Sequence, residues 1–231
     1  MDKSACPTAE ALERRVDGAR RQPTEMVAPC TFSDPYTMEY SLHRPSRLLR
    51  RDIELVFRPD LDDEYQRDPR GAAAGVEKDE WLSRHLLACP TWQPASCDLS
   101  EMSATVNAER FQLLHKFDAW ARQLRAKLAP HWCDCSCPME GNARYGKPTS
   151  AIYNELEGLT ALLKYDAVPV GCCGIVLHPK WQRRAYPVTI FTTAPLDAVQ
   201  AACAEVDAEC DEEALKATLA RAEEEYMKRE S

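Results

Sequence analysis

Prolines set the strongest limit on how this chain can fold, because each one fixes its own backbone angle and interrupts helices and sheet ladders. The 231-residue sequence contains 16 prolines and only 8 glycines. Nine of the prolines fall within residues 1–96, at Pro7, Pro23, Pro29, Pro35, Pro45, Pro59, Pro69, Pro90 and Pro94. Only short apolar patches lie between them. We therefore expect residues 1–96 to form an extended, proline-punctuated arm with short helices.

Short elements are expected inside this arm. Residues 48–57 could form a strand or a helical turn, and residues 81–89 favour a short helix. The small residues at 70–76 are typical of a linker.

Residues 97–231 are expected to form a compact α+β domain with an acidic C-terminal helical segment. Asp98 and Glu101 resemble a capping box at the start of a first central helix, and Pro130 follows its end. Its apolar residues recur at helical spacing, at Leu114, Phe117, Ala121, Leu124 and Leu128. After a loop over residues 131–148, Thr149 or Ser150 would cap a second central helix. The expected buried face of that helix is Ile152, Leu156, Leu159 and Leu163.

Two strands and a pair of apolar stripes complete the expected fold. Residues 168–177 and 185–193 are rich in β-branched residues and predict a hairpin. The stripes between Leu196 and Tyr226 are offset, so either Asp211 caps a separate last helix or one long helix changes phase. The predicted class is α+β and helix-dominated, with a long irregular N-terminal arm, two central helices, one β-hairpin and C-terminal acidic helices.

The net charge of −8 is concentrated near the C-terminus. Residues 197–231 hold eleven acidic and four basic side chains, so this segment carries −7 and the rest is nearly neutral. Binding to nucleic acid needs a positive face, which makes nucleic acid an unlikely partner except through a local basic patch. That patch contains Arg44, Arg47, Arg50 and Arg51.

The sequence predicts an intracellular protein without a membrane span. No stretch approaches the ~18 consecutive apolar residues that a membrane helix requires. Residues 1–22 lack the apolar core of a secretory signal, and residues 8–22 favour a polar surface helix instead. Acidic residues in that helix argue against a mitochondrial transit peptide. The cytoplasm is therefore the favoured compartment, with the mitochondrion as the alternative.

Eleven cysteines raise the question of metal binding or redox chemistry. Their odd number and the lack of an export signal favour reduced thiols. His131, Cys133, Cys135 and Cys137 place four potential zinc ligands within seven residues. The alternating spacing differs from usual zinc motifs, so the favoured interpretation is that the cysteines are small apolar residues near a core. The sequence therefore favours a protein without a cofactor, with zinc as the alternative.

Catalytic signatures are sparse. The sequence contains no glycine-rich phosphate loop, no nucleophile elbow and no dinucleotide-binding fingerprint. A pairing of Cys172 or Cys173 with His178 near the predicted hairpin is the remaining candidate for nucleophilic catalysis. An enzyme is therefore the less favoured interpretation.

These observations favour a non-catalytic structural or interaction subunit of a larger intracellular protein assembly, with other subunits as partners. The N-terminal arm would lie along a partner. The expected partner-binding residues are Arg44, Arg47, Arg50, Arg51, Ile53 and Phe57. The first alternative is a zinc-stabilised binding module that uses residues 131–137. The second is a small enzyme with a cysteine-based site near the hairpin.

Overall fold

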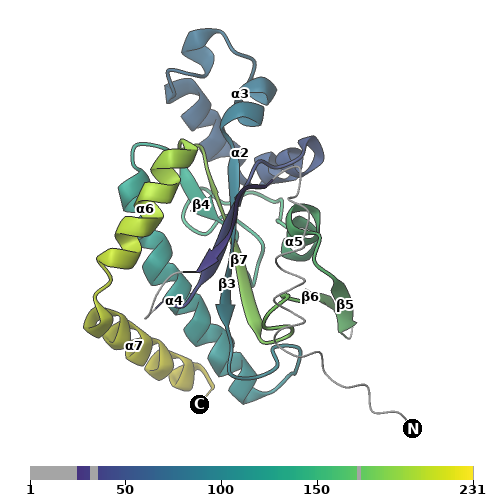
Figure 1. The fold of residues 1–231 in the computed structure, drawn as a ribbon, viewed down its shortest axis with the longest axis vertical. Coiled ribbons are helices and arrows are strands. Elements are labelled where there is room, and N and C mark those ends of the chain that lie inside the picture. The colour runs from purple at the N-terminus through teal and green to yellow at the C-terminus, as the bar shows by residue number, and fades with distance from the viewer. Residues whose placement is uncertain (1–24, 32–35, 171–172, 231) are drawn as a thin grey trace.

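The computed structural model describes residues 25–31, 36–170 and 173–230 (Figure 1). In chain order the elements are β1 (Glu25–Thr31), β2 (Glu39–His43), α2 (Arg47–Arg67), the short 3-10 helix η1 (Ala72–Ala74), α3 (Lys78–His85), β3 (Leu87–Pro94), α4 (Ala104–Leu128), β4 (Cys133–Cys135), α5 (Glu155–Leu163), β5 (Ala167–Val170), β6 (Cys173–Val176), β7 (Ala185–Thr192), α6 (Leu196–Ala208) and α7 (Glu212–Glu230). This mixture confirms the predicted helix-dominated α+β class. Across the same described ranges, no helix combines the length and apolar character needed to cross a membrane.

Five strands form one antiparallel sheet in the order β1-β2-β3-β7-β4. Its longest ladder joins β3 to β7, from Leu87 opposite Thr192 to Pro94 opposite Ala185. β7 is paired along both edges, because β4 lies on its other side. β5 and β6 pair only with each other in a separate two-stranded sheet.

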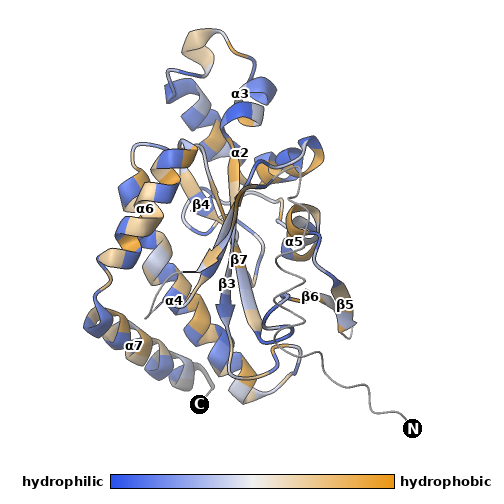
Figure 2. Ribbon diagram, viewed as in Figure 1, coloured by the Kyte–Doolittle hydropathy of each residue, from blue (hydrophilic) through white to orange (hydrophobic). Residues whose placement is uncertain are grey.

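Helices cover both faces of the sheet (Figure 1). One apolar core lies between the sheet and helices α4, α6 and α7, and the other lies between the sheet and helices α2, α3 and α5. Successive side chains of β7 point to opposite faces, so Val188 and Ile190 enter the first core and Phe191 enters the second. The helices carry alternating apolar and hydrophilic bands, as expected for elements with one buried side (Figure 2).

Helix α4 confirms the prediction from helical spacing. Every residue of the predicted stripe, from Leu114 to Leu128, is buried in the first core. The predicted start was wrong by several residues. Ser103 is the N-cap and accepts a hydrogen bond from the Val106 N–H, whereas Asp98 accepts from Ser100 in a preceding turn.

Residues 36–96 differ from the predicted extended arm. Tyr36, Met38 and Leu42 are buried in the first core, and β2 and β3 are inner strands of the sheet. Strands from both sides of position 97 therefore belong to one sheet. The predicted polar helix at 8–22 lies outside the described residues.

The prolines misled the prediction because the fold accommodates them within regular elements. Pro29 lies in the edge strand β1, where a missing N–H is tolerated, and Pro90 lies within β3. Residues 48–57 form part of the long helix α2 rather than a strand or a single turn.

Pro59 produces a kink in α2 that another segment stabilises. Phe57 has non-helical backbone angles, as expected two residues before a proline that cannot donate to the carbonyl of Leu55. The single hydroxyl proton of Thr149 is shared between the carbonyl oxygens of Leu55, at 3.3 Å, and Val56, at 3.1 Å, while Oγ1 accepts from the Ala151 N–H at 3.2 Å. Thr149 therefore supplies a hydrogen-bond donor to the carbonyl groups at the kink of α2, and it does not cap the second central helix.

The second central helix and the hairpin also differ from expectation. Helix α5 begins at Glu155 with Asn154 as its cap, so Ile152 precedes the helix and is exposed instead of buried. The predicted loop at 131–148 contains β4. The predicted strand at 168–177 is divided into β5 and β6, which form the hairpin with each other, while β7 pairs with β3 and β4.

The C-terminal segment follows one of the two predicted alternatives. α6 and α7 are separate helices, and the carboxylate of Asp211 accepts a hydrogen bond from the Ala214 N–H at the start of α7. Leu215 and Ala222 are buried on α7, while Glu212, Glu213, Glu223 and Glu224 of the same helix are exposed.

The bonds at the α2 kink lead to a stability prediction. Thr149→Val removes the hydroxyl and leaves the Leu55 and Val56 carbonyl groups without this donor, so we expect a loss of about 1 kcal/mol in the free energy of unfolding. Denaturant unfolding measures the loss. Thr160→Val is the matched control, because the Thr160 hydroxyl bonds only to the Leu156 carbonyl of its own exposed helical turn. Equal destabilisation by the two variants would contradict this role of Thr149.

Candidate functional site

The cysteines of the predicted metal set lie mainly in the core. Cys133 and Cys135 are two residues apart on β4, so their side chains point to the same face and pack in the first core beside α4. Their register places Cys133 opposite Thr192 and Cys135 opposite Ile190 of β7. The alternating pattern thus corresponds to one buried face of a strand.

The other two predicted ligands lie apart from this face. Cys137 follows β4 and is buried in a turn, where its N–H donates to the Asn142 carbonyl. His131 precedes the strand and is half-buried at a surface hollow. Within the part of the chain that the structure describes, no three His, Cys, Asp or Glu side chains are gathered as a metal site.

Burial also changes the acidity of the strand cysteines. Desolvation raises the pKa of Cys133 to about 12 and raises the pKa of Cys135 well above its ordinary value. As thiols in the first core, Cys133 and Cys135 pack as small apolar residues.

His178, the candidate catalytic base, has both ring nitrogens engaged. Its Nδ1 accepts from the N–H groups of Lys180 and Trp181, so Nε2 carries the proton and donates to the Glu39 carboxylate at 2.9 Å. The ring also stacks on Trp181 with a centroid separation of 4.4 Å. His178 therefore fixes the turn before β7. Cys172 lies outside the described residues, as does the side chain of Cys173.

The fold buries some of the predicted partner-binding residues and leaves others exposed. Ile53 and Phe57 are fully buried in the second core, so the prediction that they contact a partner was wrong. Arg50 is also buried and donates to the Pro45 carbonyl. Arg44 donates to the Ser83 carbonyl at 2.9 Å and so joins the segment after β2 to α3. The other two predicted residues, Arg47 and Arg51, are exposed.

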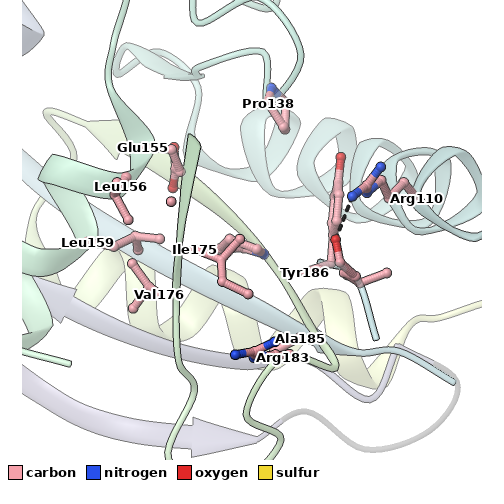
Figure 3. Close-up of a pocket in the computed structure, with 13 residues that line it drawn as sticks. Arg110, Pro138, Glu155, Leu156, Leu159, Ile175, Val176, Arg183, Ala185 and Tyr186 are labelled. Atoms are coloured by element: carbon pink, nitrogen blue, oxygen red, sulfur yellow. Dashed lines mark hydrogen bonds between the residues drawn. The ribbon is translucent and has the colours of Figure 1, made fainter. Parts of the chain in front are cut away.

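A cleft that the sequence did not indicate lies between α5, β6, β7 and the start of α4 (Figure 3). Its volume is about 220 Å³. The walls include Leu156, Leu159 and Val176, with Tyr186 and Arg110 on the opposite side from Glu155 (Figure 3). Such a cleft can hold a small ligand or one side chain of a partner.

Glu155 is the one acidic residue that lines this cleft. Its carboxylate accepts hydrogen bonds from Ser136 Oγ at 2.9 Å and from Thr189 Oγ1. Desolvation raises the pKa of Glu155 to about 7, against the opposing effect of these hydroxyl groups. A carboxyl group that titrates near neutral pH can exchange a proton with a bound ligand.

Sequence patterning contains only a weak signal for this carboxyl group. Glu155 and Glu157 both lie in the first turn of α5, where acidic residues are favoured by the helix dipole. The choice between them depends on β7, because Thr189 and Ser136 face Glu155 while Glu157 remains exposed. That contact joins segments far apart in the chain, so local patterning does not reveal it.

Glu155 leads to a prediction of pH-dependent stability. Its pKa rises from an ordinary 4.5 to about 7 in the folded protein, so the folded state binds more protons within this window. The free energy of unfolding should therefore fall as pH rises from about 4.5 to 7, by on the order of 2–3 kcal/mol. Glu155→Gln removes the ionisation, and we expect this variant to exceed the wild type in stability at pH 8, with a smaller difference at pH 5.

Denaturant unfolding at both pH values measures this difference. Glu157→Gln, an exposed change on the same helix, is the control and should leave the pH dependence unchanged. An advantage for Glu155→Gln that is the same at pH 5 and pH 8 would contradict the assigned environment of Glu155.

Comparison with known proteins places these features in a family. Residues 86–203 match the family model of the methylmalonic aciduria and homocystinuria type D protein. Individually curated proteins give no match. The matched residues extend from the start of β3 into α6, include every residue that lines the Glu155 cleft, and make up just over half of the chain. The family indicates an interaction or accessory role and not a known catalytic one. The chain belongs to the family of the methylmalonic aciduria and homocystinuria type D protein.

Proposed function

We propose that this chain is a non-catalytic interaction subunit of an intracellular assembly, and that its partner protein docks on the outer face of α2. This α2 outer face consists of Arg47, Leu48, Arg51, Leu55 and Arg58. It lies outside residues 86–203, so the choice of this surface rests on the structure and not on the family match.

Exposed apolar side chains are the observation that carries the proposal. Leu48 is 75% exposed and Leu55 is 46% exposed, two turns apart on the same side of α2. Ile152 is 70% exposed, and Thr149 fixes the segment before it to the α2 kink. Among the described residues only five large apolar side chains are exposed, and three of them are these. Leu48 and Leu55 thus form an exposed apolar pair on one side of α2, a feature typical of protein-binding surfaces.

The charges around these side chains indicate the chemistry of the partner. Arg51 and Arg58 are exposed and form no ion pair with a described residue, and Arg47 makes only a long contact of 3.9 Å with Asp79. Asp52 is the exposed acidic residue between them. The face is therefore locally basic on a chain of net charge −8. An apolar partner surface with acidic residues at its rim would fit it, since complementary charges favour encounter and orientation.

One buried arginine and two buried apolar residues hold α2 in place beneath this surface. Arg50 donates to Pro45, while Ile53 and Phe57 anchor α2 in the second core. The partner would thus meet a helix that is already fixed in place, which reduces the entropy lost on binding. This differs from an arm that becomes ordered along a partner.

Loss of the central apolar contact tests the proposal. Leu48→Asp buries an unpaired charge in the expected interface, so we expect at least a tenfold loss of partner capture, or about 1.4 kcal/mol. Tagged wild type and variant are compared by affinity capture from native extract with quantitative mass spectrometry. Met102→Asp is the matched control, because Met102 is 85% exposed and lies before α4, away from α2.

The expected result is a protein with an acidic, apolar surface that wild type and Met102→Asp capture equally and Leu48→Asp does not. A thermal melt of each variant confirms the fold. If Leu48→Asp captures every specific protein as well as the wild type does, the α2 outer face is not the docking surface.

A further inference from the structure

A basic hollow lies on the surface at the end of α2 and beside the last turns of α4. Its volume is about 620 Å³. Its lining residues are Arg67, Arg122, Arg125, Ala126, Ala129, Pro130, His131, Trp132 and Cys133. Three of these nine residues are arginines, one is a histidine and none is acidic. We call this feature the arginine hollow.

Hydrogen bonds to backbone carbonyl groups hold two of the arginine side chains in place. Arg125 Nε donates to the Cys133 carbonyl at 2.7 Å, which leaves the two terminal nitrogens of its guanidinium for a ligand. Arg67 Nη2 donates to the Pro130 carbonyl at 2.9 Å and also pairs with the buried carboxylate of Glu64. Glu64 therefore neutralises Arg67, and the remaining positive charge comes from Arg122 and Arg125.

Arg122 has no acidic partner among the residues that the structure describes. Its guanidinium carbon lies 5.4 Å from the centre of the Tyr145 ring, and that of Arg125 lies 4.2 Å from the same centre. The two arginines are three residues apart on α4, so their like charges face the same side of the helix and repel each other. An anion bound between them would remove this repulsion.

We infer that the arginine hollow binds a phosphate ester. Guanidinium groups bind phosphate oxygens through paired N–H donors, and Arg122 and Arg125 both retain such donors. The volume exceeds what a single phosphate group fills and lies in the range of small-molecule sites. Ala126, Ala129 and Pro130 provide an apolar wall for the organic part of the ligand.

The hollow is separate from the docking surface proposed above. Arg67 is the last residue of α2, whereas the α2 outer face lies in the first half of that helix, before and at the kink. A variant of one feature should therefore leave binding at the other intact. Leu48→Asp is expected to bind the phosphate ester as the wild type does.

Titration with phenyl phosphate tests the inference, with inorganic phosphate and phenol as comparison ligands. Isothermal calorimetry or amide chemical shifts at constant ionic strength report binding. Arg122→Gln should weaken phenyl phosphate binding at least tenfold, while Arg122→Lys should weaken it less because a single ammonium keeps the charge without the paired donors. Arg122 makes no hydrogen bond to a described residue, so the change should leave the fold intact.

Arg221→Gln is the control, since Arg221 is an exposed arginine on α7. Tighter binding of phenyl phosphate than of phenol or inorganic phosphate supports a phosphate-ester site. Equal weakening by Arg122→Gln and Arg221→Gln would show only general charge attraction and would overturn the inference. Absence of phenyl phosphate binding to the wild type would overturn it as well.

Discussion

The ladder between β3 and β7 is the interaction on which the rest of the structure depends. It pairs segments that lie far apart in the chain over eight residues, from Leu87 opposite Thr192 to Pro94 opposite Ala185. β2 pairs with the free edge of β3 and β4 pairs with the free edge of β7, and helices pack on both faces of the resulting sheet. The ladder also lies within the residues that match the family model. Without this long-range pairing, neither apolar core would have a sheet to pack against.

β7 also positions the chemistry of the Glu155 cleft. Thr189 points toward α5 and donates to the Glu155 carboxylate. Tyr186, Val188 and Ile190 lie on the other face of β7 and are buried in the first core, although Tyr186 also reaches the wall of the cleft. Alternation along β7 thus directs Thr189 to Glu155 while its neighbours Val188 and Ile190 pack in the core.

Local signals in the sequence predicted two features of the helices correctly. The apolar stripe of α4 and the cap at Asp211 both depend on residues within a few turns of each other. The prediction of an extended arm was wrong because prolines such as Pro59 are accommodated by partners distant in sequence, in this case Thr149.

Contacts between residues distant in sequence also limited the prediction of the site. Alternating cysteines at 133 and 135 fit both a ligand set and a buried strand face, and only the pairing of β4 with β7 separates the two.

Acidic and basic side chains lie on different surfaces of the molecule. Glu212, Glu213, Glu223 and Glu224 of α7 are exposed, and Lys127 of α4 pairs with Glu205 and Glu209 of α6. Basic side chains gather instead on the α2 outer face and in the arginine hollow. An accessory protein with separated basic and acidic surfaces can orient its partners, since like charges disfavour the wrong face.

Strands on both sides of position 97 share one sheet, and amide hydrogen exchange of the isolated protein tests whether residues 36–96 open together with β7. We expect the hydrogen-bonded amides of β2 and β3 to exchange about as slowly as those of β7, because they open only when the whole sheet opens. Fast exchange of β2 and β3 in the isolated protein, with slow exchange confined to the helices after residue 97, would contradict the account.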